Sequence, residues 1–376
     1  MANSVAPIRR SRRRLMALEM FSRAIVRPPA AVGIENRHVR EILVVELWNI
    51  GDVVLLLPFL AQLRAMFPES KVTLLARPHA RIILQGSGLV DEFMDKGDAE
   101  GNWLSLNPLA GEWGELWRLR RRLKNRRFDL AFQCRAHVRE HFILAMSRAK
   151  RRIGIAFGEC DGLLTDAVEV KDPHGHKVDD WLRLLSVVGG PVQATPQSLC
   201  LSEPERLRAR RFLERNGVSQ TDIVVGIHPG ASVPEKRWPL RRFAEVAKHL
   251  SSRDGVRVMA FVDPEGYGSS IGELDGVIPA RVGLREMMAL LQRCTVLVCN
   301  DSGPMHLAGA LGVPTAAIFN EGIARWFAPL GESHELISSA NLQSDEMTGS
   351  AGGLEAIPAE QVLSAVDRLI ARKTRR

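Results

Sequence analysis

The chain has 376 residues, 45% of them hydrophobic and 25% charged, with a net charge of +8. This length fits two domains, and this composition excludes a disordered chain. The most apolar stretch, residues 42–60, is interrupted by Glu46, Asn49 and Asp52, so we expect no membrane-spanning helix. Five cysteines without a C-x-x-C pair, and the lack of a signal-peptide pattern, indicate reduced thiols in a cytoplasmic protein. No spacing of His, Cys and carboxylates is typical of a metal site.

The positive charge is concentrated at the N-terminus. Residues 1–40 contain nine arginines and two glutamates, a balance of +7, and a second basic cluster lies at residues 118–127. We expect residues 1–40 to form a basic arm that contacts an anionic membrane surface or an acidic glycolipid. Within it, residues 12–27 fit an imperfect amphipathic helix or a disordered tail equally well. A nucleic-acid partner is not expected, because aromatic residues make up only 6% of the chain and no recognition motif accompanies the charge.

Apolar runs typical of strands alternate with helical patterns along the rest of the chain. In the first half we expect strands at 41–47, 71–76 and 128–134, one helix that ends at residue 67, and another at 177–188. After a Gly/Pro-rich break at 189–196, we expect strands at 223–228, 256–262, 295–299 and 315–319, and helices at 239–250, 284–292, 305–311 and 358–373. Near-continuous apolar strands alternating with helices are typical of parallel sheets.

This pattern predicts an α/β protein with two domains. The expected units are a basic arm at 1–40, an N-terminal domain at 41–190, a linker at 191–204, a C-terminal domain at 205–345 and a final segment with a helix at 346–376. A ligand is expected in the cleft between the domains, because ligands of such sheets bind beyond the carboxyl ends of the strands.

Three turns between a strand and a helix carry residues suited to chemistry. The first contains Gly51 and Asp52, and Asp52 falls at the predicted N-cap of the helix that follows. An aspartate at this place is either a simple helix cap or a carboxylate that takes a proton from an acceptor hydroxyl. The residues alone leave both roles open.

The second turn, at residues 228–232, contains Gly230 and is followed by Lys236. A glycine turn after a strand lets the backbone approach a phosphate closely, and Lys236 would add a positive charge to such a site. A surface turn with a solvated lysine is the alternative interpretation.

The third turn, at residues 300–306, follows a strand and opens a helix. Asp301 or Ser302 is expected to cap this helix, and its free N–H groups then form a site for an anion. His306, in the first helical turn, can donate a hydrogen bond to a phosphate oxygen. The chain has neither a Walker A sequence nor G-x-G-x-x-G, which disfavours a P-loop kinase and an ordinary dinucleotide-binding dehydrogenase.

Together these turns resemble glycosyltransferase family nine, the ADP-heptose:lipopolysaccharide heptosyltransferases. The resemblance is carried by Gly51-Asp52-x5-Pro58, by His228-Pro229-Gly230-Ala231 with Lys236-x-Trp238-Pro239, and by Asp301-Ser302-Gly303-Pro304-Met305-His306. It covers about residues 41–340 and implies a GT-B architecture, with two Rossmann-like domains whose parallel sheets face an interdomain cleft. It also implies metal-independent, inverting transfer of a heptose, without a cofactor, from a nucleotide diphosphate sugar such as ADP-heptose to a lipopolysaccharide-core-type acceptor.

By position, the resemblance implies that Asp52 is the general base on the acceptor side and that Lys236 binds the donor phosphate. The remaining donor-binding candidates are Gly230, Asp301, Ser302, Gly303 and His306. Lysine, histidine and a helix N-terminus together would supply positive charge to the departing diphosphate. Arg135 and Arg139 are candidate contacts for an acceptor phosphate, with a solvated loop as the alternative.

Two departures from the family pattern leave the substrates open. Leu56 stands where the family often has a threonine, so a polar contact to the acceptor is missing. Residues 263–266, Asp-Pro-Glu-Gly, replace the glycine-rich turn that holds the donor's nucleoside. The alternatives are therefore a same-family transferase with another nucleotide-sugar donor, or a catalytically silent homologue that binds an acidic glycan or a membrane.

Overall fold

The structure is a computed structural model that describes residues 38–95, 113–156, 158, 161–170, 172, 175–191, 193, 198–320, 324–331, 333–338 and 353–374. Residues 1–37 of the predicted arm, including its predicted helix, lie outside this range, as do Cys160 and part of the predicted linker. No helix in the described ranges is long and apolar enough to cross a membrane.

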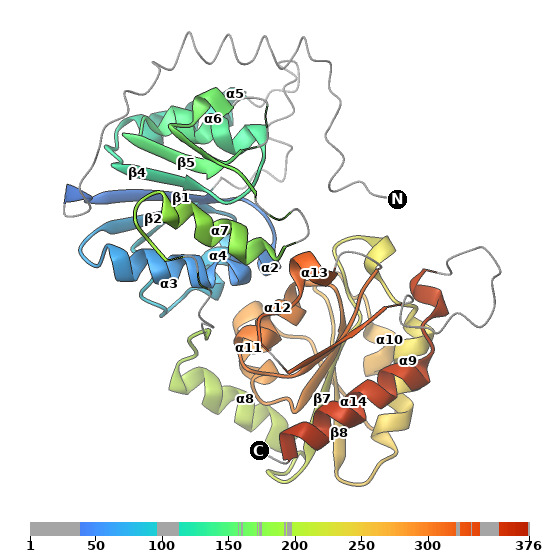
Figure 1. Ribbon diagram of the computed structural model, residues 1–376. Helices are drawn as coiled ribbons and strands as arrows, with labels where there is room; N and C mark the ends of the chain where they lie inside the picture. Colours follow the sequence, from blue (N-terminus) through green and yellow to red (C-terminus); the bar gives the residue numbers. More distant parts are fainter. Residues whose placement is uncertain are drawn as a thin grey trace, which may run out of the picture.

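The N-terminal domain is built on a six-stranded parallel sheet (Figure 1). Its strands are β1 (Glu41–Glu46), β2 (Lys71–Ala76), β3 (Glu92–Asp95), β4 (Leu130–Gln133), β5 (Arg151–Ile155) and β6 (Asp166–Val168). Its helices are α2 (Ile50–Leu55), α3 (Leu57–Met66), α4 (Pro78–Ile83), α5 (Trp113–Lys124), α6 (Val138–Ser147) and α7 (Lys177–Ser186), with a short 3-10 helix, η3 (Asp161–Leu163).

The C-terminal domain repeats this plan. Its strands are β7 (Ile223–His228), β8 (Val256–Phe261), β9 (Val277–Ala280), β10 (Val296–Asn300), β11 (Thr315–Ile318) and β12 (His334–Ile337). Its helices are α8 (Glu203–Arg215), α9 (Leu240–Ser251), α10 (Ser269–Gly272), α11 (Leu284–Leu291), α12 (Gly303–Ala310), α13 (Ala324–Phe327) and α14 (Ala359–Thr374), with 3-10 helices η4 (Pro234–Lys236) and η6 (Leu354–Ala356).

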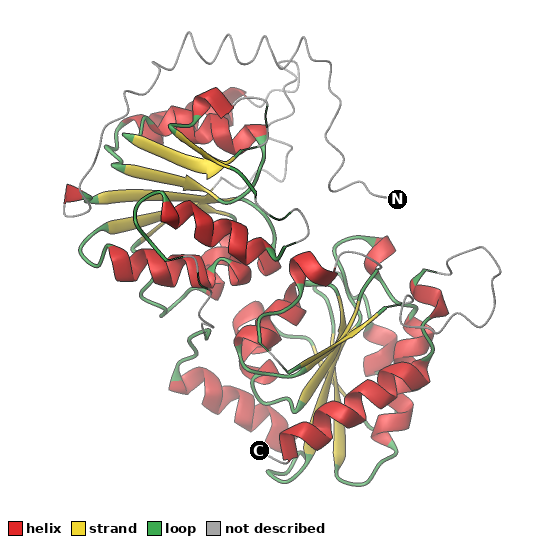
Figure 2. Ribbon diagram, in the orientation of Figure 1, coloured by secondary structure: helices red, strands yellow, loops and turns green. Residues whose placement is uncertain are grey.

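The two sheets have equivalent strand orders, β3-β2-β1-β4-β5-β6 and β9-β8-β7-β10-β11-β12, with every adjacent pair parallel. Helices cover both faces of each sheet (Figure 2), and the central strands are accordingly buried on both sides. The predicted pair of parallel α/β domains is therefore confirmed. In each sheet the order of the strands along the chain reverses at one point, between β1 and β4 or between β7 and β10. Ligands of such folds bind at this point.

The single helix expected after Asp52 is two helices. Pro58 lies in the first turn of α3, and because proline has no N–H the hydrogen-bond ladder of α2 cannot continue through it. The chain therefore ends α2 at Leu55 and restarts at Leu57. Several elements were not predicted, namely β3, β5, β6, β9, β12, α4, α5, α6, α8, α10 and α13. Most of them are short, and the longer helices α5 and α8 are mostly polar.

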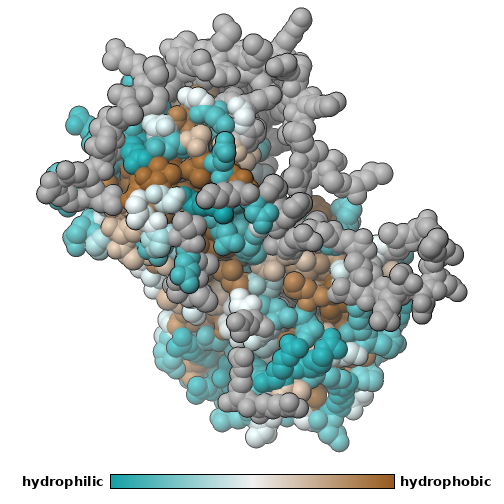
Figure 3. Space-filling view, in the orientation of Figure 1, coloured by the Kyte–Doolittle hydropathy of each residue, from teal (hydrophilic) through white to brown (hydrophobic). Residues whose placement is uncertain are grey.

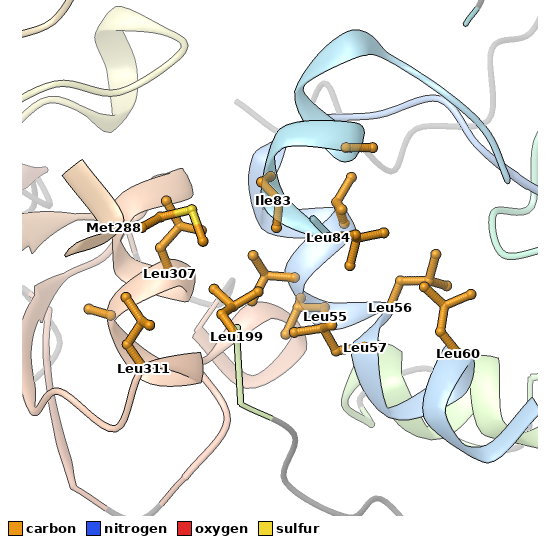
Figure 4. Close-up of a cluster of buried hydrophobic side chains, with 14 of the residues drawn as sticks. Leu55, Leu56, Leu57, Leu60, Ile83, Leu84, Leu199, Met288, Leu307 and Leu311 are labelled. Carbon is orange, nitrogen blue, oxygen red and sulfur yellow. The ribbon is translucent and has the colours of Figure 1, made fainter. Parts of the chain in front are cut away.

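An apolar contact joins the two domains. Figure 4 shows leucines of α2 and α3, together with Ile83 and Leu84, facing Met288 of α11, Leu307 of α12 and Leu311, the C-cap of α12. Leu199 lies between the two groups, and its N–H donates to the carbonyl of Ala310. Away from this contact, the near face of the C-terminal domain is mostly hydrophilic, and a hydrophobic band crosses the near face of the N-terminal domain (Figure 3).

Candidate active site

The first turns of α2 and α12, one from each domain, pack against each other through two glycines. A Cβ on Gly51 would overlap with the imidazole of His306, and a Cβ on Gly303 would lie 2.8 Å from the Cβ of Ile50. Each helix therefore accepts a side chain of the other where it has none itself. This contact brings the predicted acceptor-side turn and the predicted donor-side turn together.

The sequence suggested that Asp52 is the N-cap of the helix that follows β1. In the structure it lies in the first turn of α2 instead. The cap is Asn49, because the helix begins at Ile50, and the Oδ2 of Asp52 accepts the backbone N–H of Asn49 at 3.1 Å. Its Oδ1 accepts a hydrogen bond from the Nη2 of Arg135. Asp52 is thus a nearly buried carboxylate held at both oxygens, just beyond the carboxyl end of β1.

Arg135 follows β4, the neighbour of β1 at the reversal point, and it pairs with the candidate base. Its guanidinium carbon lies 4.6 Å from the ring centre of Trp48 and 5.6 Å from that of Phe327, which ends α13 of the other domain. Arg135, the predicted contact for an acceptor phosphate, therefore pairs with Asp52 and lies near two aromatic rings. Arg139, in the first turn of α6, contributes positive charge to the neighbouring Glu140.

Two further carboxyl groups are buried beside this pair. Glu46 ends β1 and accepts the backbone N–H of Trp48 at 3.0 Å, and Glu140 accepts the indole N–H of Trp48 at 2.7 Å. Burial, and next the charge of Asp52, raises the pKa of Glu46 to about 8. Burial also raises the pKa of Glu140 well above its usual range. Glu46 therefore holds a proton at neutral pH, and of the three carboxyl groups Asp52 is the one that accepts a hydrogen bond from Arg135.

On the donor side, Lys236 and Asp301 form an ion pair. The Nζ of Lys236 lies 2.6 Å from Oδ2 of Asp301, and 30% of the lysine side chain remains exposed. Asn300 ties the two donor turns together, because its Oδ1 accepts the N–H of Trp238 and its Nδ2 donates to the carbonyl of Pro229. The buried amide thus fixes where the segment that carries Lys236 lies.

The N-terminus of α12 has Ser302 at the N-cap and Pro304 in the first turn. The hydroxyl of Ser302 is buried without a hydrogen-bond partner among the described residues, and its side chain does not cap the helix. An α-helix cannot satisfy its first N–H groups internally, so this terminus offers donors and a positive dipole end. An anion is the group that such a terminus favours.

His306 carries no positive charge in this arrangement, which corrects the expected cationic role. Burial lowers its pKa to about 4, against the opposing effects of the Asp301 and Asp52 charges. A neutral imidazole still has one N–H to donate. The charges of Asp52 and Lys236 both reach His306. The predicted base and the predicted phosphate lysine are therefore both near this histidine.

The turn around Gly230 is closed by Asp263, which the sequence placed only in a divergent loop. A Cβ on Gly230 would overlap with the carboxylate of Asp263, and that carboxylate lies 2.9 Å from the Nε2 of His228. Arg237 covers the ring of Tyr267 at 4.4 Å. The divergent loop is thus joined to the donor turn by an acid–histidine contact.

The structure brings together Asp52, Arg135, Gly303 and His306 at the domain contact, with Asp301 and Lys236 beside them. The sequence analysis missed Glu46, Trp48, Glu140 and Phe327. A glutamate at the end of an otherwise apolar strand was a usable signal for Glu46, because a charged residue is rarely fully buried without a partner. Within the described ranges, no group of three or more His, Cys, Asp or Glu side chains could hold a metal ion.

Solved structures with this fold include a glycosyltransferase of family 9 from Veillonella parvula. It matches with a TM-score of 0.75 and 24% identity, over 90% of this chain and 99% of its own. The ADP-heptose lipopolysaccharide heptosyltransferase II of E. coli matches with a TM-score of 0.68 and 22% identity, over 89% of this chain and 99% of its own. These matches confirm the fold of two Rossmann-like domains.

Sequence comparison identifies the family. Lipopolysaccharide heptosyltransferase 2 of Salmonella typhimurium is 26% identical over 304 residues, which are 77% of this chain and 85% of that protein. Residues 116–351 match the sequence model of glycosyltransferase family 9 (heptosyltransferase), a range that includes Lys236, Asp301 and His306 and follows Asp52. This match spans more than half of the chain, and the chain therefore belongs to glycosyltransferase family 9, the heptosyltransferase family.

Proposed function

We propose that this protein transfers a heptose, with inversion, from ADP-heptose to an acceptor of the lipopolysaccharide-core type, without a metal ion. One observation carries the proposal. The first turn of α2, which carries Asp52 of the N-terminal domain, packs against His306 of α12, and Lys236 of the C-terminal domain pairs with Asp301, two residues before α12 begins. Base and phosphate cation thus meet where the two domains meet.

On the acceptor side, Asp52 takes the proton of the attacking hydroxyl. A carboxylate has about four lone-pair sites, and Asp52 uses one for Arg135 and one for Asn49, so lone pairs remain for the acceptor. The hydroxyl oxygen then forms a bond to the anomeric carbon from the face opposite the diphosphate. Direct attack on that face inverts the configuration, and a proton acceptor in the transition state contributes typically 10²- to 10⁴-fold.

On the donor side, the bond between the anomeric carbon and the diphosphate oxygen breaks, and negative charge develops on that oxygen. Lys236 and the N–H groups at the start of α12 stabilise this charge, as fixed donors do in a water-poor site. Asp301 cannot donate to phosphate, because a carboxylate only accepts, so its part is to aim Lys236. His306 contributes a neutral hydrogen bond.

The choice of a heptose donor rests on relatives. The Salmonella protein is a lipopolysaccharide heptosyltransferase, and the E. coli relative of known structure is an ADP-heptose lipopolysaccharide heptosyltransferase. The turn at Asp263 differs from the family pattern, and its contact with His228 places the difference beside the donor turn. The donor is therefore the part of the proposal to test first.

The test supplies the purified protein with ADP-heptose and a delipidated core acceptor, beside a panel of other nucleotide diphosphate sugars. We expect transfer from ADP-heptose above all, unchanged by EDTA, and a product whose anomeric configuration by NMR is opposite to that of the donor. If the protein transferred sugar only from another sugar nucleotide, that compound would be the donor in place of ADP-heptose. Nucleotide binding without turnover on any acceptor would favour the silent homologue.

We also propose that the protein works at the cytoplasmic face of a membrane, held there by its basic arm at residues 1–40. The arm has a balance of +7, and each basic residue near an anionic leaflet contributes about 1 kcal/mol. Because the proposed acceptor is linked to lipid, residence at the surface raises its effective concentration. The described part of α5 offers further exposed cations, Arg121 and Lys124 among them.

A further inference from the structure

The guanidinium of Arg135 lies within range of two aromatic rings that belong to different domains. Trp48 follows β1 of the N-terminal domain, and Phe327 ends α13 of the C-terminal domain. Distances of 4.6 and 5.6 Å from the guanidinium carbon to the ring centres are in the range of cation–π attraction. We call this group of Trp48, Arg135 and Phe327 the Arg135 cage.

Three carboxyl groups lie near this one guanidinium. Asp52 receives its hydrogen bond, while Glu46 and Glu140 are close enough to interact with it electrostatically. The Nε of Arg135 has no hydrogen-bond partner among the described residues, so hydrogen bonds alone do not fix the orientation of the guanidinium. The two ring faces supply a restraint that the carboxyl groups do not.

The ring of Trp48 is itself held firmly. Glu46 accepts its backbone N–H and Glu140 accepts its indole N–H, which uses both hydrogen-bond donors of the residue. The ring of His137 adds an edge contact, with ring centres 5.9 Å apart. This wall of the cage is therefore rigid and belongs wholly to the N-terminal domain.

The other wall depends on how the two domains dock. His176 caps α7 by accepting the N–H of Val178 at its Nδ1, so its Nε2 carries the proton and donates to the carbonyl of Ala328 at 2.9 Å. Lys177 lies 6.0 Å from the ring centre of Trp326. Both contacts tie α13 and the residue after it to the N-terminal domain, and Phe327 lies between them in sequence.

We propose that Arg135 is a positioning residue for Asp52 and that Phe327 couples this positioning to domain docking, because only the docked C-terminal domain completes the Arg135 cage. The inference rests on the proposed function for its kinetic consequence, although the cage itself does not. Undocking removes Phe327, and the guanidinium is then free to turn from Asp52 toward the oxygens of Glu46 and Glu140, which accept hydrogen bonds even when protonated. The base is thus oriented for an acceptor only while the donor-binding domain is in place.

A double-mutant cycle on kcat tests the coupling. Phe327→Leu keeps an apolar side chain and removes the ring, and we expect kcat to fall about 3- to 30-fold with the KM for the donor unchanged. Phe327→Tyr, which keeps the ring, should have a kcat close to that of the unmodified protein. In an Arg135→Gln background, Phe327→Leu should lower kcat little further, because the guanidinium that the ring contacts is already absent.

Two variants separate this effect from general loosening of the interface. Trp326→Leu removes the neighbouring ring of α13, which contacts Lys177, so it measures loosening of the interface alone and should lower kcat less than Phe327→Leu does. If Arg135→Gln does not fold, Arg135→Lys keeps the positive charge that pairs with Asp52, and the effect of Phe327→Leu should shrink in that background. Equal losses in Trp326→Leu and Phe327→Leu, or a full loss from Phe327→Leu in both Arg135 backgrounds, would overturn the inference.

A second readout is independent of activity. Protons of a guanidinium near aromatic faces show ring-current shifts, so the Arg135 Nε–H resonance, assigned by its loss in Arg135→Lys, should lie upfield and move in Phe327→Leu. An unshifted resonance that Phe327→Leu leaves in place would exclude the cage even in an active enzyme. An inactive protein with the shifted resonance would instead contradict the proposed function and leave the cage intact.

Discussion

Gly51 of α2 lies directly against the imidazole of His306 of α12, with no space between them for a Cβ. The reciprocal contact of Gly303 with Ile50 repeats this arrangement on the other side of the domain contact. The two glycines thus do more than leave the backbone free to approach a phosphate. They let α2, which carries Asp52, and α12 approach each other across two domains.

Gly51→Ala is therefore expected to destabilise the protein. In most helices this change is favourable by about 1 kcal/mol, but here the new methyl group meets a buried ring, and overpacking costs about 1–3 kcal/mol. Chemical denaturation measures the loss, and transfer should fall with it. Gly283→Ser is the matched control, since nothing lies within 4 Å of the added Cβ and serine suits an N-cap. Greater stability in Gly51→Ala would show that the helices are not in contact.

Lys236→Ala should weaken binding of ADP by about 10- to 100-fold, because a hydrogen bond to a charged group contributes about 1.5–3 kcal/mol. Isothermal calorimetry gives the two dissociation constants directly. Lys248→Ala removes an exposed lysine from α9 and should leave ADP binding unchanged. Equal ADP affinity in Lys236→Ala and the unmodified protein would remove Lys236 from the diphosphate site.

The raised pKa of Glu46 predicts a pH-dependent stability. Burial moves this pKa from 4.5 to about 8, so between these values the folded protein holds a proton that the unfolded chain has released. Stability contributed by the protonated group is complete below about pH 4.5 and is lost as the pH rises to 8, at most about 1.4 kcal/mol per pH unit. Glu46→Gln removes the titration.

We therefore expect the difference in unfolding free energy between Glu46→Gln and the unmodified protein to grow in favour of the variant from pH 5 to pH 8. Denaturation curves at four pH values measure it. Glu245→Gln, which changes an exposed carboxylate on α9, should follow the unmodified protein throughout. Parallel curves for Glu46→Gln and the unmodified protein would mean that Glu46 is ionised in the fold.

Deletion of residues 1–36 tests the proposed membrane arm. The loss of its positive charge should abolish flotation with anionic liposomes at low salt, while turnover on a soluble, delipidated acceptor is preserved. Equal flotation of both forms would mean that the membrane contact lies at the basic residues 118–127, or that the protein makes no membrane contact. Loss of turnover on the soluble acceptor would make the arm part of the catalytic fold.

The sequence predicted the two-domain fold well, because buried parallel strands such as β2 and β7 are apolar runs whose ends can be read directly. The turns that hold Asp52 and Lys236 were also predicted, since glycines and polar residues punctuate the ends of those strands. Edge strands such as β6 were missed, because three half-exposed residues carry no apolar pattern.

The site itself could be predicted only in part. The pairing of Arg135 with Asp52 joins residues 83 positions apart, and nothing in their local sequences specifies it. Phe327 reaches Arg135 from another domain, which is a result of domain docking and not of any motif. The neutral state of His306 likewise depends on burial by both helices, whereas its residue type alone suggested a cation.

The rate of transfer by Asp52→Asn tests the proposed mechanism most directly. The amide keeps the size of the side chain and an oxygen that can accept one of its two hydrogen bonds, from Arg135 or from Asn49, but it is far too weak a base to take the acceptor proton. We expect kcat to fall about 10²- to 10⁴-fold with the ADP dissociation constant unchanged, and Asp367→Asn, on the surface of α14, to retain full activity. Turnover by Asp52→Asn close to that of the unmodified protein would contradict the mechanism proposed here.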